Sequence, residues 1–546
     1  MKSRYIKTFG VGLSLALAVN ISGCTDLDET LYSKVASENH EFTDAENAAS
    51  LADVYNKVID EYWGWFGLVD IMEEASDVWG VPNRIGIGWG DLYVSMHKHE
   101  FNSEIGHFQV NWDQNYAGIN ACNKALANDA VNSSKSVSAI IRSMRALYYY
   151  NLLDLYRNIP LDTVFVHEDG WTPEQSDPKK TFEFIESELL AVVDDLPTAV
   201  SMSSFNQYAG HMLLAKLYLN RNAWFYDDPD DSYYEKCLQH LDKVIEGPFT
   251  LANDYSDNFQ EDISSSKEII YGITLENKYK GGNFMANLWC HEAGRATYEF
   301  SGWATGGGIV FPQFLNIYEP NDNRLKKCWN WGKQYKANGE EILVDGEPLI
   351  YDTTLHSIND PGCYPFESAR LIKYEIVAGD FGTSYDDIPY FRLADAYLMK
   401  AECLLRLGKN EEEAAELVTA VRRRNFDNPE DAIVTVDQLK GGSKYAYGHH
   451  ENKGKQGEAD DWVITKEGGD DIELGGLLDE LAREFVCEAH RRDDLIRFRI
   501  KGTDMNVFNG KSWFCKDAVA DRHCDLFPIP KSALDGNIKL KQNPGY

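Results

Sequence analysis

The chain has 546 residues, of which 43% are hydrophobic, and its 87 Asp and Glu outnumber its 53 Lys and Arg, which gives a formal net charge of −34 at pH 7. A surface this acidic repels the phosphates of nucleic acid, and no basic stripe in the sequence offsets that repulsion, so we exclude nucleic acid as a partner. The same argument disfavours acidic sugars, unless the chain folds a local basic pocket.

The first 23 residues have the pattern of an export signal. Lys2, Arg4 and Lys7 form a positively charged start, and residues 11–21 form an apolar run that is too short to span a bilayer. The run ends in the sequence ISGC, which resembles the lipobox of bacterial lipoproteins and predicts lipid attachment at Cys24. The alternative is an ordinary cleaved leader with an incidental cysteine.

The mature chain then divides into a tether and a body. Residues 24–42 are polar and acidic, which suits a tether that links a lipid to a folded domain. No Pro/Gly/Ser-rich linker interrupts residues 43–546, so we expect one compact body there. Within that body, apolar residues recur at helical spacing in four parts, which predict a helical scaffold: residues 43–60, 111–246, 390–425 and 477–498.

Several helix boundaries can be predicted from local chemistry. Residues 140–156 carry a clear apolar stripe, and Asn158 followed by Pro160 predicts the end of that helix. Gly408 predicts another helix end, and Asn410 with Glu413 resembles a capping box at the next helix start. Short connections favour two antiparallel hairpins of tetratricopeptide type, without a regular period: residues 208–220 with 233–245, and residues 390–407 with 411–424.

The stretch 477–498 predicts one long helix with a densely charged face. Glu484, Glu488, Arg491 and Arg492 stand three, four or seven residues apart on it, where carboxylates and guanidiniums can pair along a helix. An acid–base pair of glutamates is the alternative. We favour ion pairing that stabilises the fold, because arginines accompany both glutamates.

Two further parts, residues 61–110 and 247–389, are rich in Gly and aromatic residues and lack helical periodicity, so we expect functional loops there. Residues 440–475 form another insertion. Nine cysteines remain after Cys24 among the chain's 10, an odd number without the spacing of a disulfide framework or a zinc site. Cys515 and Cys524 bracket a short loop and could pair. The acidic residues 227–231 are either a turn between helices or a weak calcium site.

Several segments together resemble the SusD (RagB/SusD) family of surface glycan-binding lipoproteins from Bacteroidetes. The lipobox at Cys24 is one, and the others are IRSMRALYYYNLLDLYRNIPL at 141–161, DIPYFRLADAYLMKAECLLRLG at 387–408, LAREFVCEAHRRDDLIRF at 481–498 and FPIPKSALDGNIKLKQNPGY at 527–546. The chain departs from the family pattern at Arg157 and Ala489, where glycine is common.

The resemblance implies a mostly α fold, in which a tetratricopeptide-like scaffold of helix hairpins carries a large, loop-rich, glycan-facing region. It also implies a surface position on the outer membrane and a partner, a SusC-like TonB-dependent transporter, to which the protein passes oligosaccharides. No cofactor and no catalytic residue is implied. The glycan itself stays open among starch-like, fructan and host-derived oligosaccharides.

A sugar ring offers an apolar face and a rim of hydroxyl groups, so its binding site needs flat aromatic rings and a few polar anchors. Trp303 is our first choice, because the starch-binding members of the family carry an aromatic residue in a comparable Gly-Trp setting. The remaining predicted contacts are Trp79 with Asn83 or Arg84 as polar partner, followed by Phe284 and Trp289. Trp329 and Trp331 are further candidates. For each tryptophan, the alternative is that it packs a loop against the helices.

Two other classes of function compete with glycan binding. A surface glycoside hydrolase needs paired carboxylates, and Glu73, Glu74 and Asp77 stand close to Trp79 in the sequence. A tetratricopeptide adaptor that binds only protein would explain the helices, but it would leave the aromatic residues between glycines unused. We therefore expect a binding protein and not an enzyme.

Overall fold

The computed structural model describes residues 44–62, 66–83, 92–275, 290, 292–302, 304, 306–359, 366–379, 385–455 and 458–546. The chain divides into two compact units, Met1–Glu41 and Phe42–Tyr546, and every described residue belongs to the second. Within the described ranges, no helix is both long and apolar enough to cross a bilayer. The predicted export signal, Cys24 and the tether lie outside the described residues.

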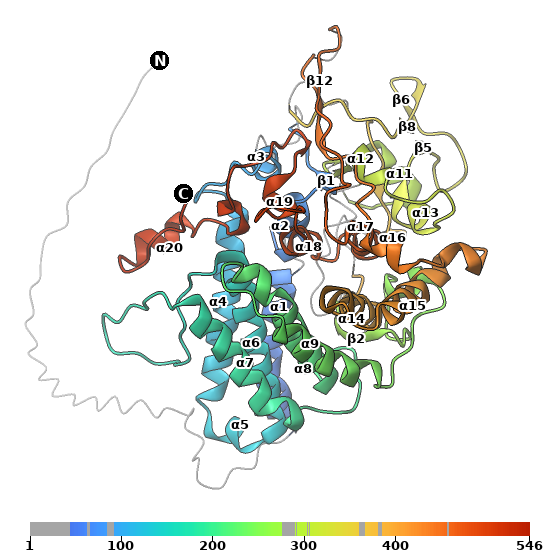
Figure 1. The fold of residues 1–546 in the computed structure, drawn as a ribbon. Helices are drawn as coiled ribbons and strands as arrows, with labels where there is room; N and C mark the ends of the chain where they lie inside the picture. Colours follow the sequence, from blue (N-terminus) through green and yellow to red (C-terminus); the bar gives the residue numbers. More distant parts are fainter. Residues whose placement is uncertain are drawn as a thin grey trace, which may run out of the picture. The chain divides into compact units, whose positions relative to one another are not determined.

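Helix hairpins form most of the scaffold, so the fold is mostly α, as predicted (Figure 1). Consecutive helices pack against each other, and α9 also packs against α14, which joins two hairpins into one layer. The helices are α1 (Asp44–Tyr62), α4 (Gly106–Leu126), α6 (Lys135–Tyr156), α7 (Pro178–Val192), α8 (Gln207–Trp224), α9 (Ser232–Ile245), α14 (Leu393–Leu407) and α15 (Glu411–Arg422). The two predicted hairpins are α8 with α9 and α14 with α15.

The predicted helix boundaries fare differently. Gly408 ends α14 with φ of 62°, as expected of a residue that lacks Cβ. The capping box at Asn410 is wrong, because Asn410 itself adopts φ of 44° and its side chain accepts no hydrogen bond from the backbone of α15. Arg157, not Asn158, closes α6, with φ of 58°. The segment predicted to begin a helix at residue 390 is the end of a strand.

The loop-rich part contains short helices and strands that periodicity did not reveal, among them α2 (Leu68–Glu74) and α3 (Leu92–His97). The longer strands are β2 (Ile269–Ile273), antiparallel to β10 (Ile388–Arg392), and β11 (Gly448–Asn452), which lies between β12 (Trp462–Ile464) and β13 (Trp513–Phe514). Two-residue pairings fix the remaining loops: β1 (Trp79–Gly80) with β3 (Ile309–Val310), β4 (Trp329–Asn330) with β9 (Arg370–Leu371), and β5 (Gly332–Lys333) with β8 (Ile350–Tyr351).

The predicted single helix over 477–498 is broken in the structure. Helix α17 (Gly475–Phe485) ends before Val486, and α18 (Arg491–Arg497) begins six residues after Phe485. Between them Cys487 and Ala489 have φ of 60° and 58°, values that turn the chain out of a helix. The break therefore redirects the arginines of α18 away from the glutamates of α17.

The carboxylates of this stretch are buried and paired with cations from distant parts of the chain. Glu484 lies 2.7 Å from Arg392 and 2.9 Å from Arg324, and it also pairs with Arg424. Glu488 lies 2.7 Å from Arg392 and 2.5 Å from Lys373. The structural interpretation of these glutamates is confirmed, but their partners are not the arginines of their own stretch.

The arginines of α18 face the opposite direction. Arg491 binds both carboxylate oxygens of Asp77, at 2.7 and 2.8 Å, and Arg492 lies 2.8 Å from Asp154 of α6. Asp322 and Arg324 form a further buried ion pair, at 2.8 Å. Because these ion pairs join the loops to the helical scaffold, the stretch 477–498 holds the two parts of the body together.

The backbone at Ala489 provides a test of this break. We expect Ala489→Gly to raise the free energy of unfolding by about 0.5–1 kcal/mol, because glycine adopts φ of 58° without the steric penalty of a Cβ atom. The matched control is Ala420→Gly in α15, another half-buried alanine, which should lose about 1 kcal/mol because its backbone is helical. Urea unfolding measures both changes, and a loss of stability in both variants would contradict the proposed strain.

Candidate functional site

The loop that carries Trp303 is anchored on both sides, although Trp303 itself lies outside the described residues. The Ser301 hydroxyl donates a hydrogen bond to the Gly379 carbonyl at 2.7 Å, and the Gly306 amide donates to the Cys290 carbonyl at 2.8 Å. Phe300 and Cys290 pack in a small apolar cluster beneath this loop. Arg84, Phe284 and Trp289 also lie outside the described residues, so these predictions stay predictions.

Trp79 does not offer a ring to solvent. Its side chain is 0% exposed, and its strand β1 pairs antiparallel with β3, with Trp79 opposite Val310. A ring buried on both faces cannot stack on a sugar, so the structure does not support Trp79 as a sugar contact. The burial of Trp79 agrees with the alternative, in which a tryptophan packs a loop against the rest of the protein. Asn83 is half-buried, and its backbone N–H donates to the Ile358 carbonyl at 2.8 Å.

Three aromatic rings lie close together near the segment of Ile358. We call them the Trp462 cluster: Trp462, His356 and His450. The ring centroid of Trp462 lies 5.2 Å from that of His356, at an interplanar angle of 35°, and 5.2 Å from that of His450, nearly edge-on at 86°. Trp462 is 37% exposed. Strand pairing places these residues, because Trp462 of β12 lies opposite Asn452 of β11, whose backbone N–H donates to the His356 carbonyl at 2.8 Å.

The Trp462 indole N–H donates to Asp460 Oδ2 at 3.3 Å, and the Asn452 side-chain amide donates to Asp460 Oδ1 at 2.8 Å. The Ser357 hydroxyl donates to Glu451 Oε1 at 2.8 Å, and the Asn359 amide donates to the same oxygen. Burial would raise the pKa of Glu451, but hydrogen bonds from His449, Ser357 and Asn359 outweigh it and lower that pKa, so the carboxylate is ionised. Amide, hydroxyl and carboxylate groups thus lie within a few residues of an exposed ring.

The histidines of this region differ in charge. Partial burial and the neighbouring His449 lower the pKa of His450, so its ring is neutral at pH 7. Hydrogen bonds to Glu451 and Asp517 raise the pKa of His449 despite its burial. A neutral imidazole can donate and accept hydrogen bonds, which suits the hydroxyl groups of a sugar.

A second group of exposed rings lies on the strands that follow the Trp303 loop. Trp331 is 36% exposed and Tyr335 is exposed as well, whereas Trp329 is buried. The Asn330 side-chain amide donates to the Tyr298 hydroxyl at 3.2 Å and to Gln334 Oε1 at 2.9 Å. Of the two further tryptophan candidates, only Trp331 can therefore offer part of a ring to a ligand.

The carboxylates that a hydrolase would need are enclosed. Glu73 is fully buried, and burial raises its pKa to about 8, so it is mostly protonated at pH 7. Burial also raises the pKa of Glu74, and both Asp77 oxygens are held by Arg491. Without contact to solvent, these three groups cannot flank a glycosidic bond.

The structure also bears on the possible disulfide between Cys515 and Cys524 and on the possible calcium site at residues 227–231. Cys515 and Cys524 are both free thiols and do not pair. Asp228, in the acidic turn between α8 and α9, lies 2.7 Å from Lys179 and 3.2 Å from Arg221, so cations of the chain balance it. Among the described residues, no group of three or more His, Cys, Asp or Glu is arranged to hold a metal ion.

Comparison with known proteins gives a consistent result. A model of the SusD family matches residues 249–546, which is more than half of the chain. The starch-binding protein SusD of Bacteroides thetaiotaomicron is 25% identical over 446 residues, covering 75% of this chain and 72% of that protein. The SusD-like protein P2 of Formosa agariphila is 23% identical over 442 residues, covering 75% of this chain and 80% of that protein.

Solved structures share the fold. A SusD superfamily protein from Parabacteroides distasonis has a TM-score of 0.69 at 19% identity, with 92% of this chain and 100% of that chain covered. Surface glycan-binding protein A from Bacteroides thetaiotaomicron, in complex with laminarihexaose, has a TM-score of 0.67 at 17% identity over 92% of this chain and 100% of that chain. Together with the match of the family model, these likenesses place this chain in the SusD family.

Proposed function

We propose that this protein is a lipid-anchored glycan-binding protein of the outer-membrane surface, which captures oligosaccharides and delivers them to a SusC-like TonB-dependent transporter. It makes and breaks no bonds. The observation that supports this most directly is the Trp462 cluster, where a partly exposed ring donates to the Asp460 carboxylate, which also accepts from the Asn452 side-chain amide. Related proteins named for starch and laminarihexaose binding support a saccharide as the ligand.

The proposed site holds a sugar through two kinds of contact. The exposed face of Trp462 packs against the C–H groups of a pyranose, and neighbouring polar side chains such as Asp460 bind its hydroxyl groups. Trp331, which is 36% exposed, offers a further ring, and Trp303 stays a predicted contact. A chain of several sugar units can then contact more than one ring at once, which adds affinity without any single deep pocket.

Affinity electrophoresis against a panel of starch-like, fructan and host polysaccharides tests this proposal, with protein that lacks residues 1–24. Retardation by at least one polysaccharide, without release of reducing ends, supports a binding protein. Release of reducing ends would support the hydrolase instead. Retardation by none of the panel would favour the adaptor, because helix hairpins alone do not explain sugar binding.

Trp462→Ala should weaken retardation by the bound polysaccharide about tenfold, because a lost aromatic stacking contact costs about 1–1.5 kcal/mol. Trp303→Ala is the parallel variant for the predicted loop. The matched control is Trp171→Ala, since Trp171 is 44% exposed but lies in the loop between α6 and α7. Circular dichroism checks folding. Unchanged retardation in the Trp462 and Trp303 variants would place the site elsewhere.

A further inference from the structure

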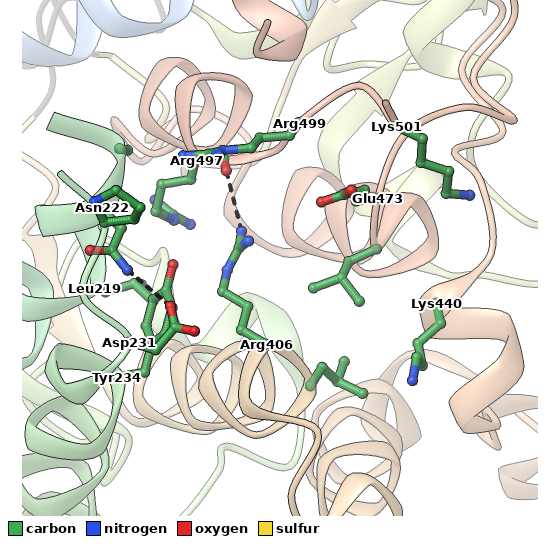
Figure 2. Close-up of a pocket in the computed structure, with 14 residues that line it drawn as sticks. Leu219, Asn222, Asp231, Tyr234, Arg406, Lys440, Glu473, Arg497, Arg499 and Lys501 are labelled. Atoms are coloured by element: carbon green, nitrogen blue, oxygen red, sulfur yellow. Dashed lines mark hydrogen bonds between the residues drawn. The ribbon is translucent and has the colours of Figure 1, made fainter. Parts of the chain in front are cut away.

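A pocket of about 400 Å³ lies among the helices, away from the loop aromatics (Figure 2). Its walls come from the ends of α8 and α14, from the turn before α9, and from the segment that follows α18. Leu405 and Leu474 provide apolar wall, and Asn222 and Tyr234 add an amide and a phenol. The pocket is large enough for a small organic ligand.

Cationic side chains dominate this pocket, although the chain as a whole carries a net charge of −34. Arg497, Arg499 and Lys501 alternate along the chain with the buried Phe498 and with Ile500. Arg497 is the last residue of α18, whereas Arg499 and Lys501 flank Ile500 in the segment that follows this helix, and alternate side chains of an extended segment share one face. The remaining cations are Arg406 and Lys440.

The backbone that carries this wall is held in place. The Glu473 amide donates to the Arg499 carbonyl at 3.0 Å, and the Lys501 amide donates to the Asp471 carbonyl at 2.7 Å. Ile472 and Ile500 form an antiparallel bridge between these bonds. The backbone positions of Arg499 and Lys501 are thus fixed before any ligand arrives, which lowers the entropic cost of binding.

Three of the cations already have acidic partners. Glu402 lies 2.8 Å from Arg406 and 3.0 Å from Arg497, and Glu411 lies 2.7 Å from Lys440. In the described part of the chain, by contrast, neither Arg499 nor Lys501 forms an ion pair, and the Lys501 ammonium donates to the Asp470 carbonyl at 3.2 Å. Arg499 and Lys501 are therefore the cations available to a ligand.

Two acidic side chains also line the pocket. Asp231 accepts a hydrogen bond from the Asn222 amide at 3.3 Å, and Glu473 is exposed. Figure 2 shows Arg406 projecting between Asp231 on one side and Glu473 and Lys501 on the other. These two carboxylates would repel a ligand that carries several negative charges, so the pocket suits a small ligand with a single anionic group.

We propose that this pocket binds a small ligand through one oxyanion, a carboxylate, sulfate or phosphate group held between Arg499 and Lys501. Guanidinium groups bind such oxyanions through two parallel hydrogen bonds, and an ammonium adds a point charge. The net negative charge of the chain disfavours acidic sugars unless a local basic pocket exists, and this pocket is such a site. An acidic monosaccharide is therefore one source of the anion. The proposal does not depend on the Trp462 cluster.

Isothermal titration calorimetry of the protein without residues 1–24 tests this pocket with four probes: sodium D-glucuronate, sodium sulfate, sodium phosphate and neutral D-glucose. We expect at least one anion to bind and D-glucose not to bind. Affinity should fall as NaCl is added, because salt screens the attraction. The anion that binds most tightly identifies the class of ligand.

The Arg499→Gln/Lys501→Gln double variant should bind that anion at least about tenfold more weakly, since both charge-assisted hydrogen-bond donors are removed. The matched control is Arg423→Gln/Lys541→Gln, which removes the same two charges from exposed positions. No binding to the unaltered protein would overturn the proposal. Equal affinity in all three proteins would also overturn it, because it would indicate an adventitious ion only.

Discussion

Replacing Glu484 with glutamine should lower the free energy of unfolding by about 3–5 kcal/mol, the cost of removing one member of a buried ion-pair network. Glu484 is fully buried and balances guanidiniums from β10, from the loop at Arg324 and from the end of α15. Glutamine keeps the shape and one acceptor oxygen, but it leaves those buried cations with one negative charge fewer. Their desolvation is then no longer offset.

Urea unfolding of Glu484→Gln measures this loss, with Glu416→Gln as the control. Glu416 is exposed on α15, so its replacement should change the unfolding free energy by less than about 0.5 kcal/mol. A similar small change for Glu484→Gln would mean that the buried glutamate contributes little and that the surrounding arginines are balanced by its neighbours.

The contribution of Glu484 to stability should depend on pH in a predictable way. Burial alone would raise the pKa of Glu484, but Arg424, Arg392 and Arg324 outweigh it and lower the pKa to about 2. The folded state therefore loses its proton more readily than the unfolded state, whose carboxyl titrates near 4.5. The stability that this group contributes is complete above pH 4.5 and is lost as the pH falls through 2.

This network also connects the scaffold to the proposed binding surface. Glu488 binds Lys373 of the segment 366–379, and Gly379 at the end of that segment accepts the hydrogen bond from Ser301 in the loop of Trp303. Weakening the network should thus loosen the Trp303 loop as well as the core. The buried charge has a positional role in addition to its contribution to stability.

Helical periodicity predicted most of the scaffold, because amphipathic helices such as α7 and α9 bury one face and expose the other. The broken stretch 477–498 could not be predicted in the same way. Its apolar spacing continues to Ala489, and the turn uses Cys487 and Ala489 at positive φ, where a glycine would have marked the break. The pairing partners of Glu484 lie more than 50 residues away in sequence, so local spacing pointed to the wrong arginines.

Burial of individual tryptophans was the hardest property to predict. Trp79 and Trp331 both stand next to glycines, yet Trp79 is enclosed by a strand pairing with Val310, whereas Trp331 is partly exposed. Trp462 was missed because its insertion, residues 440–475, reads as glycine-rich and charged. The three apolar residues WVI after an acidic turn were the available signal for a short strand, and an edge strand presents alternate side chains to solvent.

Glu61→Gln should make stability less dependent on pH, by about 3 kcal/mol between pH 5.5 and 7.5. Glu61 of α1 is buried and accepts hydrogen bonds from Asn115 at 3.3 Å and Asn151 at 3.0 Å. Burial raises its pKa to about 8, although both amides oppose the shift. The folded protein then keeps a proton that the unfolded chain releases above pH 4.5, so stability falls by about 1.4 kcal/mol per pH unit between 4.5 and 8.

Glutamine cannot ionise and offers a donor and an acceptor, as the protonated acid does, so Glu61→Gln removes this dependence without removing the hydrogen bonds. Urea unfolding should find the variant more stable than the unaltered protein, by an amount that is about 3 kcal/mol larger at pH 7.5 than at pH 5.5. Asp53→Asn, an exposed position on the same helix, controls for the lost charge. Other buried groups, such as Glu73, titrate in both proteins and cancel in the comparison. Parallel slopes for the variant and the unaltered protein would mean that Glu61 is ionised in the folded state, and its hydrogen bonds with Asn115 and Asn151 would then stabilise a buried charge.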